Sequence, residues 1–202
     1  MILELIEMYR VVPVLVLHDQ SRAKAIGKLL VEHKLPIVEL TLRTQSAFES
    51  LSELVKIEGL CVGVGSVQTT HQLIQARSFG ASFAVSAGIN ERLVSKALEL
   101  DFDYLPGVST PSEILDGINQ GQRVLKWFPA TALGGVKTLE AVSAPFPNMK
   151  FVPTGGISKE NRHDYLALDT VLGVGGSWMF SKSISDVEFF EKLEESLVDI
   201  KG

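Results

Sequence analysis

Short apolar runs rich in Val, Ile and Leu recur along the chain, and each ends in small or polar residues before an amphipathic stretch begins. The runs cover residues 11–17, 37–42, 61–66, 83–88, 103–108, 124–129, 151–156 and 171–176. Runs of this length that alternate with helical segments are typical of βα units on a parallel sheet. Eight of them predict an α/β fold of the (β/α)8, or TIM barrel, type with parallel strands.

The segments between the runs carry helix signals. Five of them, at residues 19–34, 44–57, 68–80, 90–100 and 110–120, have helical length, and four begin with a good N-cap residue: Asp19, Thr44, Asn90 and Thr110. We expect one domain over residues 1–202 that starts with a short helix at about residues 1–10. The 202 residues are close to the smallest length for such a barrel, so the loops must be short. A doubly wound open sheet is the alternative, but no G-x-G-x-x-G follows the first run.

Composition narrows the function classes. The chain is 46% hydrophobic and 21% charged, with a formal charge of −5, so no overall field attracts nucleic acid. The longest strongly apolar stretch is far shorter than the roughly 18 residues that span a bilayer. A single cysteine, Cys61, and a start without a basic leader favour a cytoplasmic protein. The four histidines are dispersed, which gives a metal site little support.

The second run and the residue that follows it place three polar residues on one face of a strand. Glu39, Thr41 and Arg43 alternate with aliphatic residues, so an acid, a hydroxyl and a base share the side that would face the barrel interior. They approach the carboxyl end of the strand, where barrel enzymes hold their active sites. The plainer alternative is a structural ion pair between Glu39 and Arg43.

The sixth run contains a lysine among aromatic and aliphatic residues. Alternation puts Lys126 and Phe128 on one face and Leu125 and Trp127 on the other. An ammonium group loses hydration in an apolar cavity, and the free amine that this favours is a nucleophile toward a carbonyl. The plainer alternatives are a lysine that reaches the barrel rim and a lysine paired with Glu39.

Glycine-rich turns follow the last two runs. They read PTGGIS at residues 153–158 and GVGGSW at residues 173–178. Loops after strands 7 and 8 of a barrel often bind phosphate, because glycine lets backbone N–H groups approach an anion. Two such turns at consecutive strand ends favour a phosphate site.

Five segments stand in a characteristic order along the chain: ELTLR at 39–43, LPGVST at 105–110, LKWFPA at 125–130, PTGGIS at 153–158 and GGSW at 175–178. Together they resemble the bacterial 2-keto-3-deoxy-6-phosphogluconate (KDPG) and 4-hydroxy-2-oxoglutarate (KHG) aldolases. The match runs from about residue 11 to residue 178. It implies a class I aldolase on a (β/α)8 barrel, typically a homotrimer, that acts on a small 2-keto acid without a metal or another cofactor.

The resemblance also implies roles for individual residues. Lys126 looks like the Schiff-base lysine and Glu39 like the general acid and base. The group that holds the substrate carboxylate and the pyruvate portion would be Arg43, Ser66, Thr154 and Phe128. The phosphate end would be Gly155, Gly156, Gly176 and Ser177.

Four positions depart from the family's usual residues. Lys34 replaces a glycine and Trp127 a Phe or Leu, which we interpret as differences in packing. Ser66 replaces a threonine and Ala87 a proline, and we expect both to touch the pocket and to affect substrate preference. The rival functions are an aldolase for the galactonate epimer or for an unphosphorylated 2-keto acid, and a barrel that binds a phosphorylated metabolite without chemistry.

Overall fold

A computed structural model describes residues 2–180 and 185–201. Each predicted run contains strand structure, and the strands are β1 (Val11–Leu15), β2 (Ile37–Thr41), β3 (Cys61–Gly65), β4 (Phe83–Val85), β5 (Asp103–Leu105), β6 (Gly107–Val108), β7 (Val124–Trp127), β8 (Lys150–Pro153) and β9 (Val174–Gly176). The helices are α1 (Ile2–Tyr9), the 3-10 helix η1 (Gln20–Arg22), α2 (Ala23–Glu32), α3 (Ala47–Leu54), α4 (Thr70–Ser78), α5 (Glu91–Glu99), α6 (Pro111–Asn119), α7 (Gly135–Ser143), α8 (Arg162–Leu166) and α9 (Asp186–Lys201).

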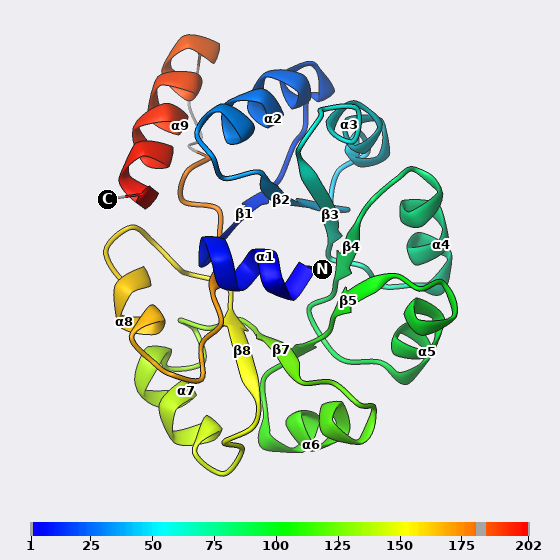
Figure 1. The fold of residues 1–202 in the computed structure, drawn as a ribbon, viewed down its shortest axis with the longest axis vertical. Helices are drawn as coiled ribbons and strands as arrows, with labels where there is room; N and C mark the ends of the chain where they lie inside the picture. Colours follow the sequence, from blue (N-terminus) through cyan, green and yellow to red (C-terminus); the bar gives the residue numbers. More distant parts are fainter. Residues whose placement is uncertain (1, 181–184, 202) are drawn as a thin grey trace.

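The strands form a curled parallel sheet with helices on its outside (Figure 1). A six-stranded part has the order β5-β4-β3-β2-β1-β9, and a three-stranded part has the order β6-β7-β8. The fifth predicted run is divided between β5 and β6 at Pro106, because proline has no N–H for the ladder. At the other edge, isolated parallel bridges join Phe151 to Val171 and Thr154 to Gly175. The parallel α/β class that the sequence predicted is confirmed.

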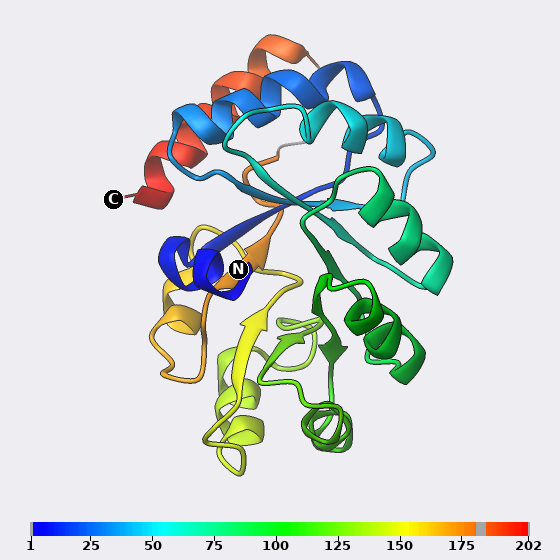
Figure 2. The ribbon, with the colours of Figure 1, turned by 45° about the vertical axis from the view of Figure 1, so that its right-hand side comes forward.

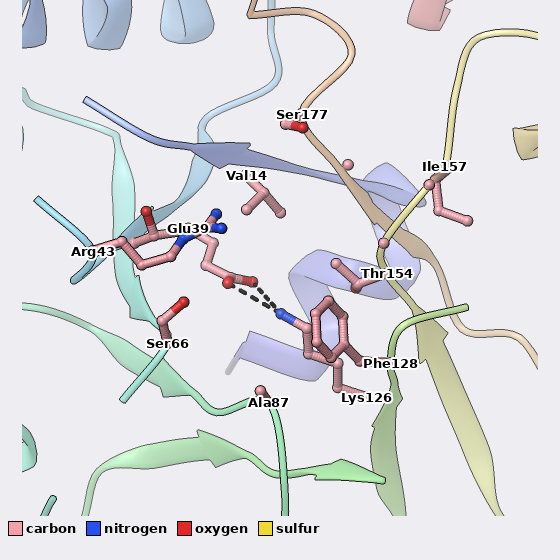
Figure 3. A pocket seen from close by; sticks show the side chains of 14 residues that line it. Val14, Glu39, Arg43, Ser66, Ala87, Lys126, Phe128, Thr154, Ile157 and Ser177 are labelled. Carbon is pink, nitrogen blue, oxygen red and sulfur yellow. Dashed lines mark hydrogen bonds and ion pairs between the residues drawn. The ribbon is translucent and has the colours of Figure 1, made fainter. Parts of the chain in front are cut away.

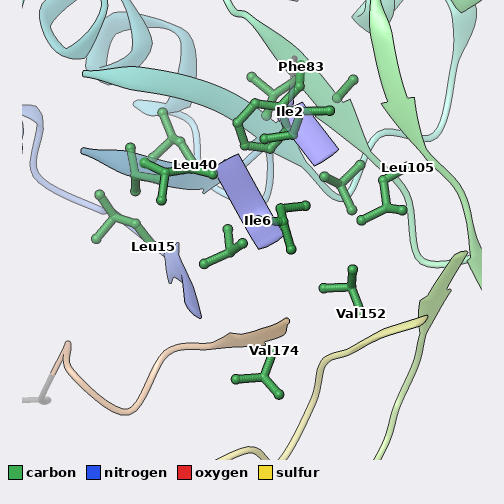
Figure 4. Packing of buried hydrophobic residues seen from close by; sticks show 14 of the residues in the cluster. Ile2, Ile6, Leu15, Leu40, Phe83, Leu105, Val152 and Val174 are labelled. Carbon is green, nitrogen blue, oxygen red and sulfur yellow. The ribbon is translucent and has the colours of Figure 1, made fainter. Parts of the chain in front are cut away.

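Helix α1 lies across the middle of the curled sheet in the view of Figure 1, and the turned view of Figure 2 shows it beside the start of β1. It covers the amino ends of the strands, where the N–H of Ile2 donates to Asp103 Oδ2 at 2.8 Å. Ile2 and Ile6 are buried in the hydrophobic core, and Figure 4 shows them among side chains from the surrounding strands. The carboxyl ends of the strands stay open for the candidate site. In residues 2–180 and 185–201, no helix combines the length with the apolar character that a membrane span requires.

The predicted helix starts are correct in three of four cases. Asn90 and Thr110 cap α5 and α6 through their side chains, and Asp19 caps η1. Thr44 was predicted as an N-cap and this is wrong, because α3 begins three residues later. The Thr44 hydroxyl instead donates to the carbonyl of Leu17 at 2.6 Å, so it ties the loop after β2 to the loop after β1.

Lys34 has the backbone conformation of a helix-ending glycine. It follows the C-cap of α2 with a φ of +55° and is exposed, so conformation and not packing distinguishes the position. A left-handed residue with a Cβ is strained, and glycine is not. We expect Lys34→Gly to raise the free energy of unfolding by about 1 kcal/mol in urea denaturation.

The matched control is Lys28, an exposed lysine inside α2. Lys28→Gly should lower the free energy of unfolding by about 1 kcal/mol, because glycine is a poor helix former. Equal destabilisation by both substitutions would contradict the conformational explanation.

Candidate active site

The predicted polar face of strand β2 points into the interior of the curled sheet. Glu39 and Thr41 are buried, and both line one cavity together with Arg43, which follows the strand. Leu40, between them in sequence, is buried on the opposite face and does not line this cavity. The alternation predicted from the sequence is therefore confirmed.

Lys126 on β7 meets Glu39 inside this cavity. Its Nζ lies 3.1 Å from Glu39 Oε1 and 3.3 Å from Oε2, and the two residues are only 5% and 4% exposed. The same ammonium group lies 5.6 Å from the centre of the Phe128 ring. The pairing of Lys126 with Glu39, offered by the sequence as a plain alternative, is present. The sequence also offered an ion pair between Glu39 and Arg43. In the structure the Glu39 carboxylate pairs with Lys126 instead.

A buried carboxylate in contact with a buried amine has a direct chemical use. The carboxylate holds the lysine in place and offsets its charge, and removal of either partner leaves an uncompensated charge in a dry site. Glu39 also lies within hydrogen-bond distance of the nitrogen, so it can accept the proton that must leave before that nitrogen attacks a carbonyl. The pair is arranged for nucleophilic catalysis by an amine.

The cavity has a volume of about 200 Å³. Its lining contains every candidate residue named from the sequence: Glu39, Arg43, Ser66, Lys126, Phe128, Thr154, Gly155, Gly156, Gly176 and Ser177. In Figure 3, Arg43 and Ser66 lie on one side of the Glu39–Lys126 pair, and Thr154 and Ile157 lie on the other. All ten residues that the sequence pattern or the family resemblance singled out therefore border one cavity, and their roles stay predictions.

The turn after β8 approaches the cavity by its backbone. Gly155 and Gly156 have φ values of +96° and +77°, a region that L-residues with side chains rarely adopt. A Cβ on Gly155 would lie 3.0 Å from the Phe128 ring, and one on Gly156 would lie 2.6 Å from Thr131 Cβ. Both glycines are therefore needed for the shape of this wall.

Other lining residues were not named as site residues in advance. Val14 and Ile157 are apolar, and nothing in their local pattern marks them. Thr41 was placed on the correct face, and its buried Oγ1 has no hydrogen-bond partner among the described residues. Ala87 was expected to touch the pocket as a departure from the family's usual residue, and it lines the cavity. Across residues 2–180 and 185–201, no three His, Cys, Asp or Glu side chains gather as a metal site would require.

Fold and site together define a class: a parallel α/β protein with a lysine and carboxylate pair in a cavity at the carboxyl ends of its strands, as in Schiff-base enzymes. The family model "KDPG and KHG aldolase" matches residues 2–195. The chain belongs to the KDPG and KHG aldolase family.

Individual relatives and a solved structure support the same family assignment. The chain is 44% identical over 170 residues to a 2-dehydro-3-deoxy-phosphogluconate aldolase of Dickeya dadantii, covering 84% of this chain and 80% of the relative. It is 42% identical to the KHG/KDPG aldolase of Escherichia coli K12, with the same coverage. A crystal structure of the Legionella pneumophila KDPG aldolase, with pyruvate captured as a covalent carbinolamine, has a TM-score of 0.93 and 32% identity, covering 98% of this chain and 97% of that one.

Proposed function

We propose that the protein is a class I aldolase that cleaves 2-keto-3-deoxy-6-phosphogluconate to pyruvate and glyceraldehyde 3-phosphate through a Schiff base on Lys126. A second substrate is 4-hydroxy-2-oxoglutarate, which gives pyruvate and glyoxylate. The single observation that carries the proposal is the buried contact of 3.1 Å between Lys126 Nζ and Glu39 Oε1 in a member of this aldolase family.

Lys126 supplies the electron acceptor that the reaction needs. Cleavage of the bond between C3 and C4 leaves an electron pair on C3, which is too unstable next to a ketone without further activation. The Lys126 amine attacks C2, water leaves, and the resulting iminium accepts that electron pair as an enamine. Protonation of C3 and hydrolysis of the iminium then release pyruvate and restore the lysine.

Glu39 moves the protons in these steps. It takes the proton of the lysine before attack, returns one to the departing hydroxyl of the carbinolamine, and takes the C4 hydroxyl proton as the carbon–carbon bond breaks. Its contact with Nζ supports the first of these roles. The later ones need the substrate hydroxyl within reach directly or through one water.

The remaining lining residues hold the two ends of the substrate. Arg43 presents a planar fork of donors to the carboxylate, and Ser66, Thr154 and Phe128 contact the pyruvate portion. The backbone N–H groups of Gly155, Gly156 and Gly176, with Ser177, receive the phosphate. Fixing both ends places C2 over Lys126 Nζ, which removes much of the entropic barrier to attack.

The same proposal includes the finer architecture. We infer that the two parts of the sheet form one closed (β/α)8 barrel in a single domain. The supports are the direct continuation of β5 into β6 and the parallel bridges between the β8 and β9 regions. The homotrimer and the cytoplasmic location stay predictions, the first from the family resemblance and the second from the sequence.

A panel of substrates tests the proposed function. Pyruvate release should be fastest with KDPG, and the unphosphorylated acid should have a kcat/KM about 100-fold lower, because loss of two charge-assisted hydrogen bonds costs about 3 kcal/mol. Ser177→Ala should slow KDPG cleavage without affecting 4-hydroxy-2-oxoglutarate, which has no phosphate.

Each rival function gives a different result in this panel. Faster pyruvate release from the galactonate epimer would identify that epimer as the substrate. Equal pyruvate release from the phosphorylated and unphosphorylated acids would show that the phosphate is not recognised. Binding of the phosphorylated acid without any pyruvate release would point to the non-catalytic barrel.

A further inference from the structure

Strand β3 carries two glycines on the face that looks toward the Glu39–Lys126 pair. Gly63 and Gly65 are spaced by two, so they share a face, and they pair in register with Glu39 and Thr41 of β2. Glycine inside a strand weakens it and often marks a close approach by another group. Both glycines lie in an extended strand, a conformation that alanine also adopts, so neither is required by the backbone.

Each glycine leaves space for a particular side chain. A Cβ on Gly63 would overlap the ring of Phe83, a large side chain of the hydrophobic core. A Cβ on Gly65 would overlap Glu39 Oε1 and would lie 2.7 Å from both Cδ and Cγ of the same residue. The carboxylate that contacts Lys126 therefore lies directly over the bare α-carbon of Gly65.

The two close approaches differ in what can move. The Phe83 ring is fully enclosed by the core, so displacing it disturbs packing. The Glu39 carboxylate is the end of a flexible side chain that borders an open cavity. A methyl group at position 65 would therefore be accommodated by rotation of Glu39 away from β3.

We propose that Gly65 is a positioning residue: its missing side chain provides the space that holds the Glu39 carboxylate in contact with Lys126 Nζ. This inference rests on the proposed function, because it gives Glu39 its place for proton transfer. Gly65 itself supplies no atom to the reaction and acts only through Glu39.

The test is Gly65→Ala, with Gly88→Ala as the matched control. A Cβ on Gly88 meets nothing within 4 Å, so this control should keep wild-type kinetics. Gly65→Ala should lower kcat about 100-fold, toward the loss expected when a general base is removed, with KM within threefold of wild type. Gly65→Ala should also melt below wild type, because it separates the two charges of a buried pair. Gly63→Ala should melt lower as well, because it displaces Phe83, but it should keep kcat within threefold of wild type.

A double-mutant cycle shows whether the effect passes through Glu39. In a Glu39→Gln background, Gly65→Ala should lower kcat by less than threefold further, because the base is already absent. An equal 100-fold loss in both backgrounds would overturn the proposal.

A crystal structure of Gly65→Ala tests the positioning role of Gly65 independently of whether the protein is an aldolase. Separation of Glu39 from Lys126 Nζ by more than 4 Å would support the positioning role even if the wild-type protein cleaved no substrate. A contact that remained near 3.1 Å would overturn it even if the aldolase activity were established.

Discussion

Replacement of Lys126 by methionine should abolish aldol cleavage. Methionine has a similar length and no amine, so no iminium forms and C3 has no electron acceptor. We expect kcat to fall by about 10⁴-fold or more, the loss typical of removing a covalent nucleophile. The measurement is pyruvate release from KDPG under saturating substrate, with enzyme concentrations high enough to detect the residual rate.

The effect of Lys126→Met on folding stability must be distinguished from its effect on kcat. Lys126→Met leaves the Glu39 carboxylate buried and unpaired, which costs about 3–5 kcal/mol when the partner of a buried charge is lost. The double variant Lys126→Met with Glu39→Gln removes both charges and should recover most of this loss while staying inactive. A folded Lys126→Met protein that retained more than a tenth of the wild-type kcat would contradict the role of Lys126.

Glu39→Gln should have the second largest effect. Glutamine keeps the shape of the side chain but cannot accept a proton from the lysine or from the C4 hydroxyl. We expect kcat to fall by about 10²–10⁴-fold, the range for a general acid–base group, while KM stays within a few-fold. Steady-state kinetics with KDPG measure both quantities.

Glu53 provides a matched control for this substitution. It forms an exposed ion pair with Lys56 at 2.6 Å on the surface of α3, where the removal of one charge has little effect. Glu53→Gln should therefore leave kcat unchanged. A Glu39→Gln enzyme with wild-type kcat would remove Glu39 from the proton-transfer role.

Much of the site follows from periodicity within single strands. Alternation placed Glu39, Thr41 and Arg43 on one face and Lys126 with Phe128 on one face, and both faces line the same cavity. This worked because each polar residue interrupts an otherwise apolar strand, so its face is marked by contrast with its neighbours. The turns after the last two strands are recognised by a different signal, the paired glycines that follow each apolar run.

Other features depend on contacts between segments far apart in sequence. Glu39 and Lys126 are 87 positions apart, and their contact depends on how β2 and β7 curve toward one another. The place of Glu39 over Gly65 depends on the register between β2 and β3. The two glycines of β3 were a visible signal, but periodicity alone does not tell which side chain approaches them.

The local conformations of Thr44 and Lys34 also could not be predicted from the residue types. Thr44 has the side chain of an N-cap, yet its hydroxyl reaches back to the carbonyl of Leu17, a partner supplied by the fold. The left-handed φ of Lys34 is determined by the turn that leads α2 into β2, and lysine gives no sign of it.

Covalent trapping tests the central claim most directly. The wild-type protein is incubated with pyruvate and sodium borohydride, and the adduct is located by peptide mass spectrometry. We predict one reduced pyruvyl adduct per chain, on Lys126, that disappears in Lys126→Met and in Lys126→Ala. Absence of an adduct from the wild-type protein, or an adduct that persists in either variant, would contradict the Schiff-base mechanism.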